Sequence, residues 1–231
     1  MKKITVVTGA SRGIGREICN LLAKDGHHAV AVARSEDKLR ELEASNPEYI
    51  TAMPTDLTNA SEVESLVSQL RAKFEKVDIL INNAGAMINK SFLDLSLEDW
   101  HSQINSNLIS AVHITKQLIP IFSENAHIVN ISSMGGFQGS AKFPGLTAYS
   151  VSKGALSILT ECLAVELSDR NIKANSLCLG AVQTDMLEDA FPGIEAPVTA
   201  NQMGKYVTDF ALNADKFYNG KILPVALEDP E

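Results

Sequence analysis

Short apolar runs alternate with amphipathic stretches along the 231 residues of the chain. The apolar runs are rich in β-branched residues and have the length of buried strands. We expect them at residues 4–8, 28–33, 49–53, 77–81, 127–132, 173–179 and 221–225. The stretches between them carry apolar residues at helical spacing, which predicts helices from residue 14 onward and at 36–44, 61–74, 97–122, 147–167 and 201–213.

This alternation is typical of an α/β fold with a doubly wound parallel sheet of about seven strands and helices on both faces. Pro120 is expected to bend or end the helix at 97–122. No linker or repeat divides the chain, so residues 1–231 are expected to form one domain.

The first strand runs directly into a glycine-rich turn, and a helix follows the turn. The turn reads Gly9-Ala10-Ser11-Arg12-Gly13-Ile14-Gly15. Gly9 permits a tight turn, Gly13 lets the backbone approach a ligand, and Gly15 lets the helix pack near the strand. The helix N-terminus then presents unpaired N–H groups to a phosphate. A turn without a ligand is the alternative for this segment alone, but its position between strand and helix favours a Rossmann-like dinucleotide site.

Composition and charge disfavour several classes of partner. A formal net charge of −8 makes nucleic acid and anionic membranes poor partners. Cys19, Cys162 and Cys178 are odd in number and far apart, so we expect reduced thiols. Neither CxxC nor HExxH occurs, and no metal site is expected. The first apolar run ends at Gly9, too early for a signal peptide, and we expect a soluble cytoplasmic protein.

The segments that follow the strands carry the informative residues, because ligands of such sheets lie beyond the carboxyl ends of the strands. An NAD site would place an acidic residue after the second strand, where this chain has Ala33 and Arg34. A guanidinium suits a 2′-phosphate, and Arg12 could join Arg34 there. A solvated charge at a helix start is the alternative for Arg34. The two arginines and the missing acid favour NADP(H), with NAD(H) less favoured.

Two more of these segments have both structural and binding interpretations. Asp56-Leu57 could cap a turn or meet an adenine, and capping is the equal or better interpretation for Asp56. In Asn82-Asn83-Ala84-Gly85 the asparagine side chains can tie neighbouring strands together, while Gly85 permits close approach to a flat ring.

Tyr149 and Lys153 stand at i and i+4, so they share one face of the helix at 147–167. A free tyrosine has a pKa of about 10 and is a poor acid at neutral pH. A lysine ammonium and a cationic nicotinamide nearby would lower that pKa and make Tyr149 a general acid, worth roughly 10²–10⁴-fold. A serine hydroxyl at the preceding strand end can hold the substrate oxygen. A Y-x-x-x-K pair alone is more often a helix-surface pair, so the conjunction of features carries the signal.

Together these motifs resemble those of the short-chain dehydrogenase/reductase family. The resemblance covers residue 3 to about residue 186 and rests on Thr8–Gly15 (TGxxxGxG), Asn82–Gly85 (NNAG), the strand ending in Ser132-Ser133, and Tyr149-x-x-x-Lys153. It implies an oxidoreductase with a bound nicotinamide dinucleotide. In the family, the helices matching 97–122 and 147–167 pair between subunits, which implies a homodimer or homotetramer.

The resemblance also implies roles for individual residues. Tyr149 would be the proton donor or acceptor, and Lys153 would hold the nicotinamide ribose. Ser133 would bind the substrate oxygen, and Asn107 would hold a water in a proton relay with Lys153. Two alternatives stay open: Asn107 could simply bond backbone, and Ser132 could replace Ser133. The implied cofactor-binding positions are Gly9, Ser11, Arg12, Gly13, Ile14, Gly15, Arg34, Asp56, Leu57, Asn83, Ala84, Gly85, Tyr149, Lys153, Gly180, Val182 and Thr184.

Three features depart from the family pattern. Leu179-Gly180 replaces the usual Pro-Gly after the sixth strand. The 16 residues from Ser133 to Tyr149 exceed the usual spacing, and we expect the extra ones, within 135–145, to wall a substrate pocket. The C-terminal residues 225–231 lack the usual glycine pair, which bears on the substrate lid and one oligomer contact.

We therefore expect an NADP(H)-dependent enzyme that interconverts a carbonyl and an alcohol on a small or medium, apolar substrate. The side chains expected to face that substrate are Met87, Met134, Phe137, Phe143, Met186, Leu187 and Phe191. A 3-oxoacyl-carrier-protein reductase is the alternative that the N-terminal two thirds resemble, although an acidic chain suits an acidic carrier poorly. A non-catalytic NADP(H)-sensing protein is the alternative of another class, and the intact Ser-Tyr-Lys set argues against it. A methyltransferase is disfavoured, because Arg34 follows Ala33 where such a site usually has an acid.

Overall fold

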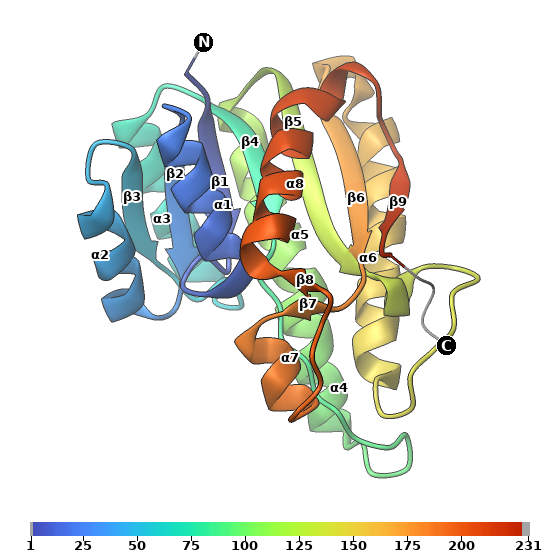
Figure 1. Ribbon diagram of the computed structural model, residues 1–231. Helices are drawn as coiled ribbons and strands as arrows, with labels where there is room; N and C mark the ends of the chain where they lie inside the picture. Colours follow the sequence, from blue (N-terminus) through green and yellow to red (C-terminus); the bar gives the residue numbers. More distant parts are fainter. Residues whose placement is uncertain (1, 228–231) are drawn as a thin grey trace.

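The computed structural model describes residues 2–227. Its main strands are β1 (Ile4–Thr8), β2 (His28–Ala33), β3 (Ile50–Pro54), β4 (Val77–Asn82), β5 (Phe122–Ser133), β6 (Lys173–Leu179) and β9 (Ile222–Val225). They form one parallel sheet in the order β3-β2-β1-β4-β5-β6-β9 (Figure 1). The strands are rich in valine, isoleucine and alanine, since both faces of the sheet are covered.

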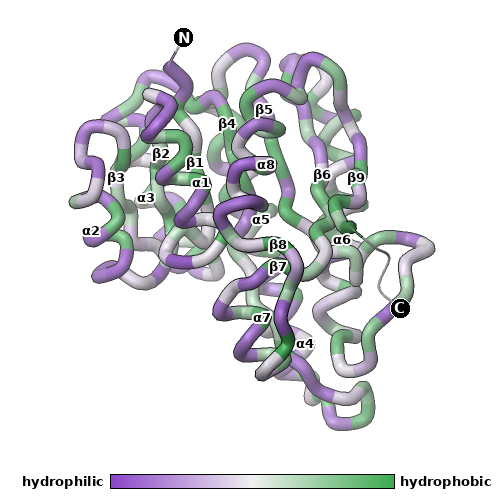
Figure 2. The backbone as a smooth tube through the Cα atoms, viewed as in Figure 1, coloured by the Kyte–Doolittle hydropathy of each residue, from purple (hydrophilic) through white to green (hydrophobic). Residues whose placement is uncertain are grey.

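Helices cover both faces of the sheet. One face carries α1 (Gly13–Lys24), α2 (Glu36–Ser45) and α8 (Ala200–Asn213), and the other carries α3 (Ala60–Lys73), α5 (Ser110–Leu118) and α6 (Thr147–Glu166) (Figure 1). Figure 2 shows hydrophobic residues concentrated along the strands and hydrophilic residues on the outer sides of the helices. The expected doubly wound, Rossmann-like α/β fold is confirmed.

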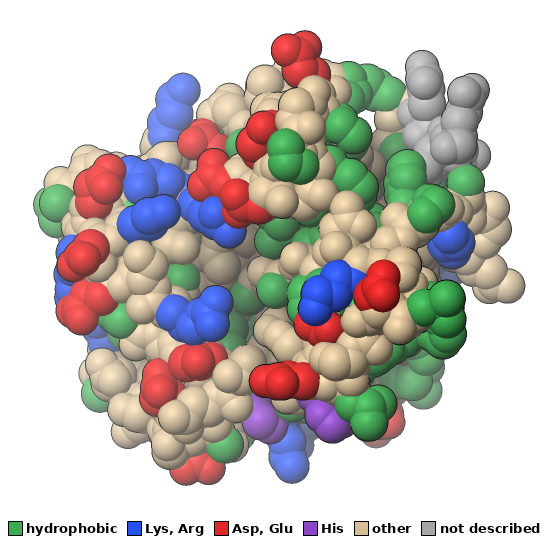
Figure 3. All heavy atoms as spheres, turned by 90° about the horizontal axis from the view of Figure 1, so that it is seen from below, with side chains coloured by type: hydrophobic (Ala, Val, Ile, Leu, Met, Phe, Trp, Pro, Cys, Tyr) green, Lys and Arg blue, Asp and Glu red, His purple; other side chains and the backbone are tan. Residues whose placement is uncertain are grey.

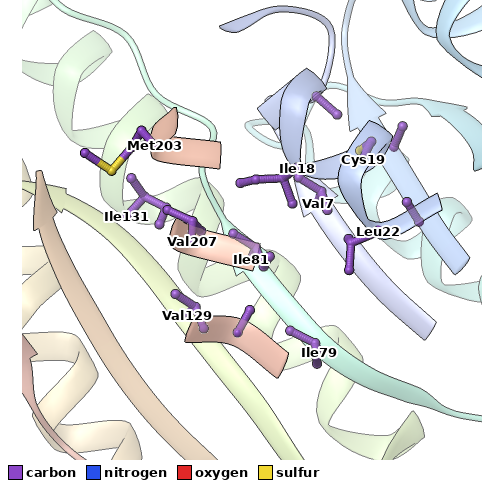
Figure 4. Close-up of a cluster of buried hydrophobic side chains, with 14 of the residues drawn as sticks. Val7, Ile18, Cys19, Leu22, Ile79, Ile81, Val129, Ile131, Met203 and Val207 are labelled. Carbon is purple, nitrogen blue, oxygen red and sulfur yellow. The ribbon is translucent and has the colours of Figure 1, made fainter. Parts of the chain in front are cut away.

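Two clusters of buried hydrophobic side chains hold these layers together, one on each face. In the first, Ile18 and Leu22 of α1 and Val207 of α8 pack on the central strands, as Figure 4 shows. All three side chains are fully buried. Truncating one such leucine or isoleucine to alanine costs about 2–5 kcal/mol, so these layers fix the position of the strand ends.

The long helix expected at 97–122 is shorter than predicted and is interrupted. It consists of α4 (Leu97–Ile104), a π-helical segment (Asn105–Ile109) and α5, followed by a 3₁₀ turn (Ile119–Ile121). Pro120 has no N–H and its ring clashes with the preceding turn, so the α-helix ends at Leu118. The expectation that Pro120 ends the helix is confirmed, but the extension to Phe122 is wrong.

Most other predicted bounds lie within one or two residues of the observed ones. Strand β5 begins five residues earlier than expected, because Phe122 already pairs with Val77 across an irregularity in the register. The segment 181–199 carries structure that the sequence did not predict. It contains the short strands β7 (Val182–Gln183) and β8 (Val198–Thr199) and the helix α7 (Asp185–Ala190) between them.

The carboxyl ends of the strands meet at one edge of the sheet, and both α4 and α7 lie beyond that edge (Figure 1). Within residues 2–227, no helix is long and apolar enough to cross a membrane. The same residues hold no group of three or more His, Cys, Asp or Glu side chains that could bind a metal ion.

Candidate active site

A cavity of about 1060 Å³ opens at the carboxyl edge of the sheet. Figure 3 looks onto this edge, where charged side chains of both signs gather on one side and hydrophobic ones on the other. The cavity wall includes these residues expected at the site: Gly9, Ser11, Arg12, Gly13, Ile14, Arg34, Asp56, Leu57, Asn83, Ala84, Gly85, Ser133, Tyr149, Lys153, Gly180, Val182 and Thr184. Gly15 and Asn107 are not part of the wall and lie behind it.

The glycine-rich turn is shaped by close backbone contacts. Gly9 has φ +68°, and a Cβ there would lie 2.8 Å from the Cα of Ala84. A Cβ on Gly15 would lie 2.5 Å from the carbonyl oxygen of Gly9, so Gly15 lets α1 pack against the turn. Its position supports the packing role expected for it and gives it no direct contact with the cavity.

Hydrogen bonds tie the end of β1 to the end of β4. The amide of Asn83 donates to the carbonyl oxygens of Thr8 (3.0 Å) and Gly9 (3.3 Å). The Thr8 hydroxyl in turn accepts from the backbone N–H groups of Asn83 (3.0 Å) and Ala84 (2.9 Å). The expectation that the asparagines connect neighbouring strands is therefore confirmed, and the turn is held rigid beside the cavity.

The N-terminus of α1 fits a phosphate group. Its N-cap residue, Arg12, makes no side-chain hydrogen bond to the first turn, and the turn from Gly9 to Ile14 faces the cavity. A helix N-terminus with free N–H groups attracts anions. Arg34 stands further along the same wall and adds a positive charge.

Arg12 contacts two carboxylates that the sequence did not connect with it. Its Nη1 lies 3.3 Å from Oδ2 of Asp185 and 3.6 Å from Oδ2 of Asp189, both on α7. The cavity wall thus includes a salt bridge between the glycine-rich turn and α7. Arg12 already has these partners, whereas no side chain of residues 2–227 forms a salt bridge with Arg34.

Asp56 caps the turn in which it lies, which is the equal or better of the two interpretations that its sequence position allowed. Its Oδ1 accepts from the backbone N–H (2.9 Å) and the hydroxyl (2.7 Å) of Thr58. Burial raises the pKa of Asp56, but the two Thr58 hydrogen bonds and the charge of Arg34 outweigh it, and the pKa lies below its ordinary value.

Tyr149, Lys153 and Ser133 come together on one wall of the cavity. Burial raises the pKa of Tyr149 to about 12, with a hydrogen bond to the Ser133 side chain acting in the opposite direction. Burial lowers the pKa of Lys153 to about 8. The Lys153 ammonium donates to the carbonyl oxygen of Ile131 (2.8 Å) and lies 5.9 Å from the centre of the Tyr149 ring.

The expected lowering of the Tyr149 pKa by Lys153 is not found in the protein alone. Desolvation of the phenolate is the largest effect, and the ammonium is held by a backbone carbonyl instead of by the phenol oxygen. A lower pKa would require further positive charge or hydrogen bonds beside the phenol oxygen.

The two serines at the end of β5 differ in their partners. The hydroxyl of Ser132 donates to the carbonyl oxygen of Lys153 (2.8 Å) and is 3 % exposed. The hydroxyl of Ser133 accepts from the backbone N–H of Gly135 (3.1 Å), and its proximity to Tyr149 acts against the rise in the pKa of that phenol. Ser133 is therefore the better placed of the two to meet a substrate oxygen.

Asn107 lies in the π-helical segment, where its side chain bonds mainly to backbone. Its Oδ1 accepts from the N–H of Ala86 (2.7 Å), and its Nδ2 donates to the carbonyl oxygen of Ala86 (3.0 Å) and to the hydroxyl of Ser152 (2.9 Å). Of the two interpretations of Asn107, these contacts match the one in which its side chain binds the backbone.

The far end of the cavity is apolar. Of the side chains expected to face a substrate, Met87, Met134, Phe143, Met186, Leu187 and Phe191 line it. Phe137, which directly follows the 3₁₀ turn at Met134–Gly136, does not line it. Sequence reasoning missed Leu146, Ile194 and Leu227, which also line the cavity. Leu227 belongs to the C-terminal residues 225–231, whose departure from the family pattern could have pointed to it. Residues 228–231 of that segment lie outside the described residues.

Comparisons with known proteins identify the family of the chain. A family model for short chain dehydrogenases matches residues 3–195. An uncharacterized oxidoreductase of Staphylococcus aureus (strain MRSA252) is 34% identical over 185 residues, 79% of each chain. Another, from Staphylococcus saprophyticus, is 32% identical over 193 residues, 81% of each chain.

The fold is also similar to a solved structure. The crystal structure of a 3-ketoacyl-(acyl-carrier-protein) reductase from Brucella melitensis, complexed with NADH, superimposes with a TM-score of 0.86. The match covers 97% of this chain and 96% of that one at 24% identity, a likeness that establishes the fold.

Proposed function

The chain belongs to the short-chain dehydrogenase family of oxidoreductases, and on this basis we propose that it interconverts a carbonyl and an alcohol with NADP(H) as the hydride carrier. The observation that carries the proposal is the wall formed by Ser133, Tyr149 and Lys153, which adjoins a phosphate-binding turn in one cavity. A nicotinamide dinucleotide suits a cavity of this size, which lies at the upper end of the usual range for ligand sites.

Three side chains divide the work of carbonyl reduction. A bound dinucleotide would supply the hydride and, once oxidised, a positive charge. Tyr149 donates the phenol proton to the substrate oxygen as negative charge develops on it. Ser133 orients that oxygen by a hydrogen bond. Lys153 would hold the ribose of the dinucleotide, and its ammonium, together with the oxidised nicotinamide, would add the positive charge that favours the phenolate left behind.

The preference for NADP(H) rests on Arg34. The position at the end of β2, where an acid would bind a ribose 2′-hydroxyl, is Ala33, and Arg34 follows it. Arg34 has no salt-bridge partner among the described residues. Asp185 already pairs with the Arg12 guanidinium, so Arg12 is expected to contribute less to binding the 2′-phosphate than an arginine without a partner would. Arg34→Ala should weaken NADPH binding by at least about tenfold and NADH binding hardly at all, since the lost bonds are those to the phosphate.

Arg40→Ala is the matched control for this test, because Arg40 lies on the exposed side of α2 and, within residues 2–227, forms salt bridges only with Glu36 and Glu43. Isothermal titration with NADPH and NADH measures both variants. Equal weakening of NADPH and NADH by Arg34→Ala would remove the assignment of Arg34 to the 2′-phosphate.

The substrate of the proposed reaction is small or medium and apolar. The aromatic, methionine and leucine side chains at the far end of the cavity support this. A 3-oxoacyl-carrier-protein reductase is the second candidate, favoured by the fold of the Brucella melitensis enzyme. The carboxylates of Asp185 and Asp189 beside the cavity and the net charge of −8 disfavour an acidic carrier.

NADPH oxidation against a panel of aldehydes, ketones and 3-oxoacyl thioesters tests the proposal, with NADH and Tyr149→Phe in parallel. Turnover that prefers NADPH and disappears in Tyr149→Phe is the expected result. Tight NADPH binding without turnover on any substrate would favour a cofactor-sensing protein instead.

We also propose that the enzyme is a cytoplasmic homodimer or homotetramer. The support is an exposed apolar stripe on α6, where Val151, Ile158 and Val165 follow each other at intervals of two turns. Sedimentation that gives a stable monomer at micromolar concentration would contradict the oligomer.

A further inference from the structure

We propose that Ser152 and Ser132 are positioning residues, which fix the backbone carbonyls of Tyr149 and Lys153 without touching the substrate. This inference rests on the proposed function, since it concerns the two residues that perform it. Each serine donates its one hydroxyl proton to the carbonyl oxygen of one of them, at 2.7 Å for Ser152 to Tyr149 and 2.8 Å for Ser132 to Lys153.

Ser152 connects Tyr149 to the loop that follows β4. Its hydroxyl donates to the carbonyl oxygen of Tyr149 and accepts from Nδ2 of Asn107 (2.9 Å). Asn107 in turn makes two hydrogen bonds to the backbone of Ala86. The chain of bonds therefore runs from the end of the sheet through the π-helical segment to the helix that carries Tyr149.

Ser132 connects Lys153 to the end of β5. Its hydroxyl donates to the carbonyl oxygen of Lys153 and accepts from the hydroxyl of Ser157 (3.1 Å). The Ser157 hydroxyl also lies 3.3 Å from the same carbonyl oxygen. The Lys153 ammonium donates to Ile131 of the same strand, so both ends of this lysine are fixed to β5.

The start of α6 needs such support. Its N-cap residue is Leu146, which makes no side-chain capping bond, and Tyr149 is the third residue of the helix. A first turn without a cap leaves N–H groups unpaired and is the part of a helix that opens most easily. The serine bonds hold this turn from two sides, at Tyr149 and one turn later at Lys153.

Neither serine has a proton left for a substrate. A serine hydroxyl donates one hydrogen bond, and both protons are used on backbone carbonyls. Both residues are also deeply buried, at 3 % and 0 % exposure for Ser132 and Ser152. Ser132 contributes to the cavity wall, but its hydroxyl proton is used on the carbonyl oxygen of Lys153. Their contribution to the reaction therefore passes through the position of Tyr149 and Lys153.

The test compares Ser152→Ala and Ser132→Ala with a control on the same helix. Thr160 is fully buried, donates its hydroxyl to the carbonyl oxygen of Leu156 (2.9 Å), and accepts from the amide of Asn130 (2.8 Å), but does not line the cavity. Thr160→Val removes a hydroxyl with the same kind of bonding, two turns or more from Tyr149. Ser152→Thr and Ser132→Thr restore a hydroxyl and test for rescue.

We expect each serine-to-alanine variant to lower kcat between about 10-fold and 100-fold with little change in KM, because small misplacements of reacting groups have effects of this size. The thermal unfolding midpoint Tm should fall by a similar amount in Ser152→Ala, Ser132→Ala and Thr160→Val. Thr160→Val should nevertheless keep the wild-type kcat. Ser152→Thr and Ser132→Thr should recover most of the activity. If one of them does not fold, the rescue is measured with the other. Unchanged kcat in both alanine variants, or an equal loss in Thr160→Val, would overturn the proposal.

A second readout separates this proposal from the proposed function. If the wild type binds NADPH but turns over no substrate in the panel, the proposed reaction is what has failed. The positioning role is then measured by NADPH affinity, since Lys153 faces the cofactor site. Affinity at least about fivefold weaker in Ser132→Ala than in Thr160→Val, restored in Ser132→Thr, would support the role. Equal affinities would overturn it.

Discussion

Replacing Lys153 with methionine should raise the stability of the protein while abolishing its turnover. The Lys153 side chain is 4 % exposed, and burial lowers its pKa from 10.5 to about 8. Because each pKa unit corresponds to about 1.4 kcal/mol, holding this ammonium in the folded state costs about 3 kcal/mol at pH 7. Methionine has a similar volume and no charge to desolvate.

One favourable contact is lost in this variant. The ammonium donates to the carbonyl oxygen of Ile131 at 2.8 Å, and leaving that oxygen without its partner costs about 1–2 kcal/mol. The net gain is then about 1–2 kcal/mol at pH 7. For a chain of this length that corresponds to a rise in Tm of about 2–8 °C.

The sign of the pH dependence distinguishes this explanation from better packing. The folded-state pKa of Lys153 lies below its unfolded value, so the penalty is fully present below pH 8 and disappears as the pH rises toward 10.5. The stability difference between Lys153→Met and wild type should therefore shrink between pH 7 and pH 10. Lys38→Met, at an exposed position on α2, is the control and should change neither the stability nor the turnover of the protein.

Urea unfolding at pH 7 and pH 10 measures the difference directly, with NADPH turnover as the activity assay. A Lys153→Met variant less stable than wild type at pH 7 would refute the reasoning. So would a stability gain that is the same at both pH values.

Three further results are expected. Burial lowers the pKa of His127, although its bond to Ala211 acts in the opposite direction, so stability should fall as the pH drops below about 6.5; His127→Gln should flatten that part of a Tm-against-pH curve. Gly9→Ala should lower both Tm and NADPH affinity, because a Cβ at φ +68° would lie 2.8 Å from the backbone of Ala84; unaltered affinity would contradict the close approach. Phe143→Ala should raise KM for apolar substrates severalfold, and unchanged kinetics on every active substrate would remove Phe143 from the pocket.

The sequence predicted the sheet well because its strands are buried on both faces. Continuous apolar runs such as Ala29–Ala33 have few alternatives in a chain with this alternation, and their order along the chain leads to the observed parallel sheet. The motif residues Gly13, Ser133 and Tyr149 stand at strand ends or helix starts, and they converge because all strands end at one edge.

What the sequence could not predict depends on contacts between distant segments. Arg12 and Asp185 are separated by 173 positions, and nothing in either local pattern indicates that they pair. The pKa of Tyr149 was expected to fall because of Lys153 but is raised by burial, a quantity that only the packed structure defines. Ser152 looks like an ordinary polar helix residue until its contacts with Asn107 and Tyr149 are known.

The central claim is hydride transfer between NADPH and a substrate carbonyl, with Tyr149 as the proton donor. Reduction of an active apolar ketone with NADPH deuterated at C4 of the nicotinamide, followed by mass spectrometry of the alcohol, tests it most directly. One deuterium per product molecule in the wild type, and a rate lower by about 10²-fold or more in Tyr149→Phe, is the expected result. Alcohol without deuterium from NADPH labelled at either face, or full turnover in Tyr149→Phe, would contradict the account.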